Sequence, residues 1–64
     1  MAHVHVQDPD KNTMLGHIST SAGPVKVSIG TNGRIDVYGF PLAVKAYLVE
    51  VQGYTPQAAA ALVK

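Results

Sequence analysis

Two runs of alternating apolar and polar residues flank a glycine-containing turn between residues 25 and 40, and this pattern constrains the fold most. Alternation with a period of two is typical of a β-strand with one buried face. A three-residue loop over residues 31–33 places apolar residues opposite one another, and Gly33 can adopt the left-handed conformation that such a loop requires. The pairs that this loop predicts are Val27 with Val37 and Ile29 with Ile35.

A second β-hairpin is expected at the N-terminus. Residues 3–7 alternate strictly, residues 8–12 are rich in turn formers, and residues 13–20 alternate more weakly. The sequence leaves the register of this hairpin open. A four-residue loop pairs Val6 with Leu15 and Val4 with His17, whereas a five-residue loop pairs Val6 with Met14 and His3 with His17.

Two helices are predicted after the strands. Pro41 suits the first position of a helix over residues 41–52, which Gly53 would end. Thr55, as N-cap, and a following proline begin a second helix over residues 55–64. The expected fold class is α+β: one domain over residues 1–64, with a small antiparallel sheet of two hairpins and up to four strands in residues 1–38, then two C-terminal helices packed on one face.

The composition narrows the classes of function. A chain of 64 residues without cysteine has a small core and no disulfide to support it. Charged residues make up 14% of the chain, compared with about 25% in typical domains, which suggests that another chain covers part of the surface. No apolar run is long enough to span a membrane, and the start of the chain does not resemble a signal peptide. We therefore expect a cytoplasmic protein with no membrane partner.

The helix over residues 41–52 suggests an interface, because apolar residues lie on two of its sides. One side can cover the sheet, and the alanine-rich last helix is too small to cover the other. We therefore expect a homodimer, or the docking of another protein, with Tyr47 as the anchor of the interface. The residues predicted to form this interface are Val44, Tyr47, Leu48 and Val51.

The histidines form a candidate metal site. His3 and His5 share one face of a strand, and the five-residue loop would place His17 opposite His3 on that face. Three imidazoles in this arrangement can bind zinc and leave a fourth position for water. The simpler interpretation is a solvated sheet face, since no carboxylate is evidently placed to orient the histidines.

The alternative function is nucleic-acid binding by the polar sheet face, where Lys26, Arg34 and Tyr38 would lie together. A net charge of +1 gives this interpretation little electrostatic support. The two helices resemble a helix-turn-helix only in outline, because the alanines of the second cannot read base edges. The single glutamate, Glu50, and the lack of any catalytic motif predict a protein that is not an enzyme and needs no cofactor.

Overall fold

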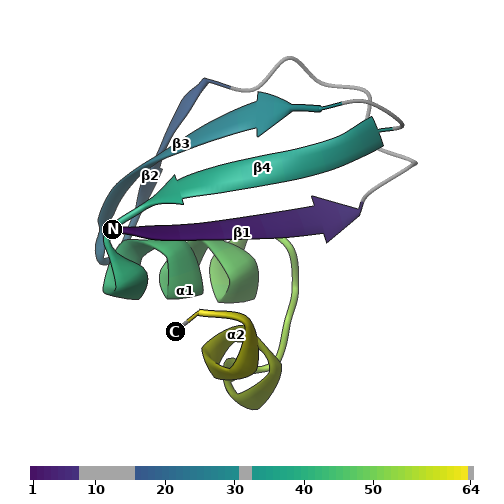
Figure 1. The fold of residues 1–64 in the computed structure, drawn as a ribbon. Helices are drawn as coiled ribbons and strands as arrows, with labels where there is room; N and C mark the ends of the chain where they lie inside the picture. Colours follow the sequence, from purple (N-terminus) through teal and green to yellow (C-terminus); the bar gives the residue numbers. More distant parts are fainter. Residues whose placement is uncertain (8–15, 31–32, 64) are drawn as a thin grey trace.

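The computed structural model describes residues 1–7, 16–30 and 33–63, which form a four-stranded antiparallel sheet followed by two helices. Both helices lie on the same side of the sheet (Figure 1). The predicted α+β fold class is therefore confirmed. In chain order the elements are β1 (Ala2–Gln7), β2 (His17–Thr20), β3 (Gly23–Ile29), β4 (Arg34–Gly39), α1 (Pro41–Glu50) and α2 (Pro56–Leu62).

The hairpin of β3 and β4 has the predicted register. The backbone N–H of Gly30 donates to the carbonyl of Arg34 at 2.6 Å, which closes the loop. Gly33 has a φ of 73°, so glycine supplies the left-handed conformation there at little cost. Thr31 and Asn32 lie outside the described residues. The observed pairs include Val27 with Val37 and Ile29 with Ile35.

The predicted N-terminal hairpin is wrong. The strand order is β1-β4-β3-β2, so β1 and β2 form opposite edges of the sheet and do not pair. β1 pairs instead with β4, with Val4 opposite Val37 and Val6 opposite Ile35. The alternation of β1 is satisfied equally well by β4, because apolar residues again meet on one face. Met14 and Leu15, which the two proposed registers used, lie outside the described residues.

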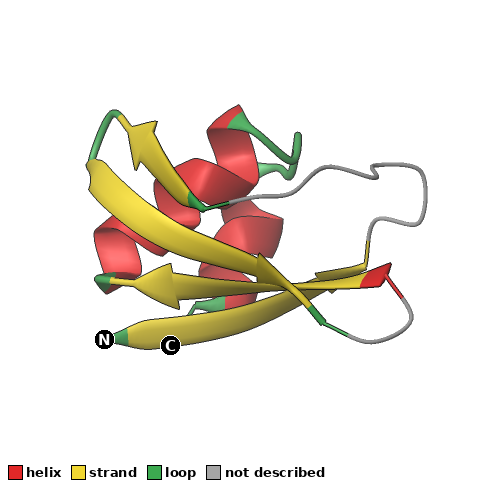
Figure 2. Ribbon diagram, turned by 90° about the horizontal axis from the view of Figure 1, so that it is seen from above, coloured by secondary structure: helices red, strands yellow, loops and turns green. Residues whose placement is uncertain are grey.

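Helix α1 closes the core. It contacts all four strands and lies across one face of the sheet (Figure 2). Helix α2 packs on α1 as a third layer (Figure 1), and Ala59 of α2 is completely buried. The core residues of the strands are Ala2, Val4, Val6, Val25, Val27, Ile35 and Val37, and those of α1 are Ala43, Val44, Tyr47 and Leu48.

The predicted helix signals are present at the helix ends. Thr55 is the N-cap of α2, and its hydroxyl accepts a hydrogen bond from the N–H of Ala58 at 3.2 Å. Helix α1 ends at Glu50, two residues before the predicted end, and the chain then turns at Gly53, where φ is 79°. Within the described parts of the chain, neither helix has the length and apolar content needed to cross a membrane.

A polar contact joins the end of α1 to the turn between β2 and β3. The backbone N–H of Ser21 donates to Glu50 Oε1 at 3.1 Å, and the Ser21 hydroxyl donates to Glu50 Oε2. The side-chain hydrogen bond, followed by the backbone one, lowers the pKa of Glu50 below its usual value of 4.5. This exposed contact ties the last turn of α1 to the sheet.

Candidate functional site

The polar face of the sheet carries all six residues that the sequence proposed for metal or nucleic-acid binding. The register places one row of residues across the four strands, and Tyr38 lies between His3 on β1 and Lys26 on β3. On the same face, Arg34 and Asp36 alternate with the buried residues of β4. The full row reads His17, Lys26, Tyr38, His3 from the β2 edge to the β1 edge.

The predicted triad of histidines does not form. His17 pairs with Lys26 at the β2 edge, while His3 lies on β1 at the other edge. Three strand spacings separate the two histidines, which is about 14 Å. The error follows from the pairing of β1, since only a β1–β2 hairpin would have placed His17 opposite His3.

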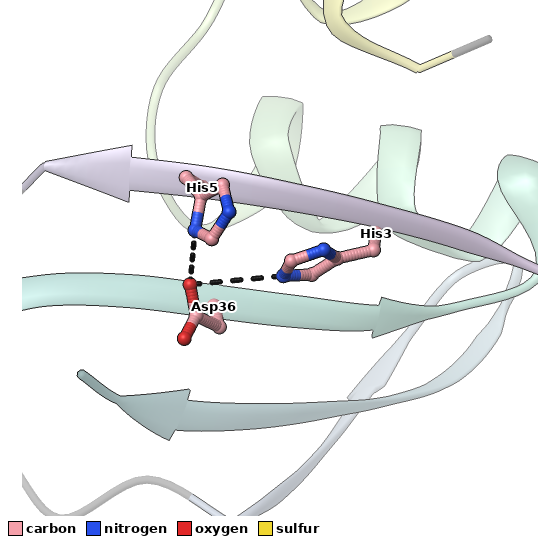
Figure 3. A group of neighbouring side chains, drawn as sticks. All are labelled: His3, His5 and Asp36. Carbon is pink, nitrogen blue, oxygen red and sulfur yellow. Dashed lines mark hydrogen bonds and ion pairs between the residues drawn. The ribbon is translucent and has the colours of Figure 1, made fainter.

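Asp36 takes the place that His17 was expected to fill. It lies directly opposite His5 in the β1–β4 ladder, and it is diagonal to His3. His5 Nδ1 and Asp36 Oδ1 form a hydrogen bond, and His3 Nε2 lies 3.7 Å from the same oxygen (Figure 3). One potential ligand atom from each of the three residues lies within 4.8 Å of the other two.

Two further side chains frame this cluster of His3, His5 and Asp36, called here the His–Asp cluster. The ring of Tyr38 stacks on that of His3, with centroids 4.3 Å apart and an interplanar angle of 6°. Arg34 Nε lies 3.7 Å from Asp36 Oδ1. Tyr38 therefore limits the orientations of the His3 ring, and Arg34 places a positive charge beside the carboxylate.

The His–Asp cluster has two chemical possibilities. Two imidazoles and a carboxylate are a common donor set for zinc and other divalent transition metals. The same groups without a metal form an ionic hydrogen-bond network between β1 and β4. The sequence contained the histidine half of this site, but Asp36 was not assigned to it because that required knowing that β1 pairs with β4.

The predicted helix interface is wrong at three of its four positions. Val44, Tyr47 and Leu48 have no exposed surface, because they lie in the core that α1 forms with the sheet and with α2. Gln52 Nε2 also donates a hydrogen bond to the Tyr47 hydroxyl at 2.8 Å, so that polar group is satisfied inside the chain. Val51, at the C-terminal end of α1, is 39% exposed. The fold therefore buries three of the four positions that were expected to bind a partner.

Exposed apolar residues instead flank the start of α1 in the chain. Phe40 is 74% exposed and Leu42 is 73% exposed, on either side of Pro41. Ala2 pairs with Gly39, so the chain start lies beside the start of α1 (Figure 1), and Met1 is 91% exposed there. We call this surface the apolar end, and it consists of Met1, Pro24, Phe40 and Leu42.

Pro24 belongs to the apolar end through the ladder of β3 and β4. A Cβ atom on Gly39 would lie 3.5 Å from the Pro24 carbonyl oxygen and 3.1 Å from Val25 Cγ1. The start of β3 is thus close to the end of β4, and Pro24 is exposed there. The apolar pattern of the helix was a partial signal for this surface, because the helix has more apolar residues than one sheet face can cover.

Comparisons of the chain with models of protein families, with curated proteins and with solved structures find no match. The case for a function is therefore carried by the two surfaces, the His–Asp cluster and the apolar end.

Proposed function

We propose that the protein is a small non-catalytic protein–protein interaction module that forms a homodimer through the apolar end. The observation that carries this proposal is the exposure of Phe40 and Leu42, at 74% and 73%. Large aromatic and aliphatic side chains anchor protein interfaces when a partner removes them from water. Large apolar side chains that remain this exposed at one end of a small domain favour an interaction site there.

The chemistry of the apolar end favours a second copy of the chain as the partner. In a two-fold symmetric dimer the same patch meets itself, so a charged patch would repel its own copy. No charged side chain occurs from Gly39 to Val44, and α1 has no acidic residue in its first turn. The segment from Gly39 to Val44 can therefore face its own copy without burying charged side chains of like sign. The lack of cysteine supports a reducing compartment, and we propose the cytoplasm.

Sedimentation velocity over a range of protein concentrations tests the proposal. The double variant Phe40→Ser with Leu42→Gln removes the two apolar side chains and keeps residues that suit the start of a helix. Ile29→Thr is the matched control, because Ile29 is 41% exposed and lies at the other end of β3 from Pro24.

The wild type and Ile29→Thr should shift from monomer to dimer as concentration rises into the micromolar range. The double variant should remain monomeric over the same range, with an unchanged circular dichroism spectrum. A wild type that stays monomeric at every concentration would refute the homodimer, and equal association of the double variant would place the interface elsewhere.

A second candidate function is the binding of single-stranded nucleic acid by the polar sheet face. Its specific support is the stack of His3 on Tyr38, with Lys26 next to Tyr38 on β3. Stacking on aromatic rings with cations beside them is how sheets bind single strands. Asp36 in the same face opposes phosphate, which is why we rank this function second.

Fluorescence anisotropy with a labelled single-stranded oligonucleotide separates the two functions. Binding to phosphates would weaken steeply with salt, whereas apolar dimerisation would change little. If the second function holds, Lys26→Ala and Tyr38→Leu should each weaken oligonucleotide binding, while the Ile29→Thr control should not. An affinity that neither variant alters would exclude this face as the binding surface.

A further inference from the structure

We propose that His3, His5 and Asp36 bind a divalent transition-metal ion of the zinc class, and that the ion fastens the edge strand β1 to β4. This inference concerns the polar face and does not depend on dimerisation at the apolar end. It rests on the placement of three ligand-type side chains from two paired strands.

The backbone sets the positions of the three ligands. Residues two apart on a strand point to the same face, so His3 and His5 project together from β1. Asp36 faces His5 across the ladder, and potential ligand atoms of the three side chains lie within 4.8 Å of one another. Tetrahedral zinc, with ligand bonds of about 2.0–2.1 Å, holds its ligand atoms roughly 3.3 Å apart. A bound ion would therefore draw the three ligand atoms together from separations of up to 4.8 Å.

The donor set selects the kind of ion. Imidazole nitrogens favour zinc, copper and nickel, whereas magnesium and calcium prefer sites made of oxygen donors. Three protein ligands leave a fourth zinc position open, and both histidines are exposed, so water can complete the coordination. The carboxylate of Asp36 also offsets part of the charge of the ion.

The neighbouring side chains act in opposite directions on such a site. Tyr38 stacks on the His3 ring and already restricts its orientation. The imidazole therefore loses less conformational entropy when it binds the ion. Arg34 lies 3.7 Å from Asp36 Oδ1 and repels an incoming cation. The arrangement therefore predicts that Arg34→Gln binds zinc more tightly than the wild type. If the His–Asp cluster were only an ion-pair network, this change would not increase the affinity for zinc.

A metal at this site has a structural consequence. Among the described strands, β1 is an edge strand that pairs with β4 alone, and the two histidine ligands lie on β1 while the aspartate lies on β4. Small domains without disulfides gain stability from such a cross-link. When the free ion concentration is about 100 times the Kd for the folded chain, binding shifts the unfolding equilibrium toward the folded state by about a hundredfold. For a domain of this size that corresponds to a rise in melting temperature of roughly 10 °C or more.

The test is isothermal titration of the full chain with zinc chloride, together with thermal melts with zinc, with magnesium and with EDTA. The ligand variants are His5→Gln and Asp36→Asn. The matched control is His17→Gln, because His17 is an exposed histidine on the same sheet face at the opposite edge.

The wild type and His17→Gln should bind one zinc ion per chain and show the rise in melting temperature. Each ligand variant should bind zinc at least about tenfold more weakly, and magnesium should have no effect. Circular dichroism of each variant confirms that it is folded before titration. Absence of zinc binding by the wild type, undiminished binding by Asp36→Asn, or an equal loss in His17→Gln would each overturn the proposal.

Discussion

Helix α1 presents two apolar surfaces that have different fates in the folded chain. The flank formed by Val44, Tyr47 and Leu48 has no exposed surface, whereas Phe40 and Leu42 at its start are about three-quarters exposed. Both surfaces consist of the same kinds of residue in the sequence. An apolar pattern in the sequence therefore identifies side chains that favour burial. Which of these side chains are buried within the same chain depends on where the other elements pack.

The largest expected effect comes from breaking the buried flank. Tyr47→Ala should destabilise the folded chain by roughly 3–5 kcal/mol, because it removes a completely buried aromatic ring and leaves a cavity. Such a loss approaches the whole stability of a small domain. Urea denaturation followed by circular dichroism should show a chain that is largely unfolded before denaturant is added.

The control for this prediction is Tyr47→Phe, which keeps the ring and loses the hydrogen bond from Gln52. It should cost about 1 kcal/mol. If the Tyr47→Ala chain were as stable as the wild type but sedimented as a monomer, this flank of α1 would be an interface and not part of the monomer core.

A smaller effect is expected from the third layer, α2, which packs on α1. Thr55→Ala removes the N-cap that accepts a hydrogen bond from Ala58, and it should cost about 1 kcal/mol. The measurement is the urea midpoint of Thr55→Ala, compared with that of Thr55→Ser, which keeps the N-cap hydroxyl. If Thr55→Ala left the midpoint unchanged, the folding of α2 would contribute little to closing the core over α1.

The exposed surface should respond differently. Phe40→Ser places a favourable N-cap where Phe40 makes no side-chain cap, and it removes little buried area. Measured at a concentration where the chain is monomeric, the variant should be as stable as the wild type or more stable by about 0.5–1 kcal/mol. A clear loss of stability would mean that Phe40 belongs to the monomer core rather than to the apolar end.

The smallest effect concerns the far end of α1, where Ser21 binds Glu50. The lowered pKa of Glu50 means that this contact stabilises the fold above pH 4.5 and is lost as pH falls through the lowered value. Glu50→Gln should therefore lower the urea midpoint slightly at neutral pH and leave it unchanged at about pH 2. A difference that is the same at both pH values would rule out the ionised carboxylate as its source.

Much of the fold could be predicted from local signals. The β3–β4 register followed from the alternating residues and Gly33, and the start of each helix followed from Pro41 and Thr55. The partner of β1 could not be predicted, because Val4 and Val6 match any strand with the same alternation.

The candidate site shows the same limit. His3 and His5 share a face because of their spacing alone, so that part was predictable. Asp36 joins them only through the β1–β4 ladder, a contact between residues 31 positions apart. The burial of Tyr47 likewise depended on which flank of α1 the sheet would cover, and the two-sided apolar pattern did not decide it.

Chemical cross-linking of single-cysteine variants tests most directly whether the chain associates through the apolar end. The chain has no cysteine, so Leu42→Cys and Val51→Cys each introduce one exposed thiol at opposite ends of α1. With a bismaleimide reagent at a concentration where the wild type is dimeric, Leu42→Cys should give covalent dimers and Val51→Cys should remain a monomer, because only the start of α1 faces the second copy. Cross-linking of Val51→Cys as readily as Leu42→Cys, or of neither, would contradict the assignment.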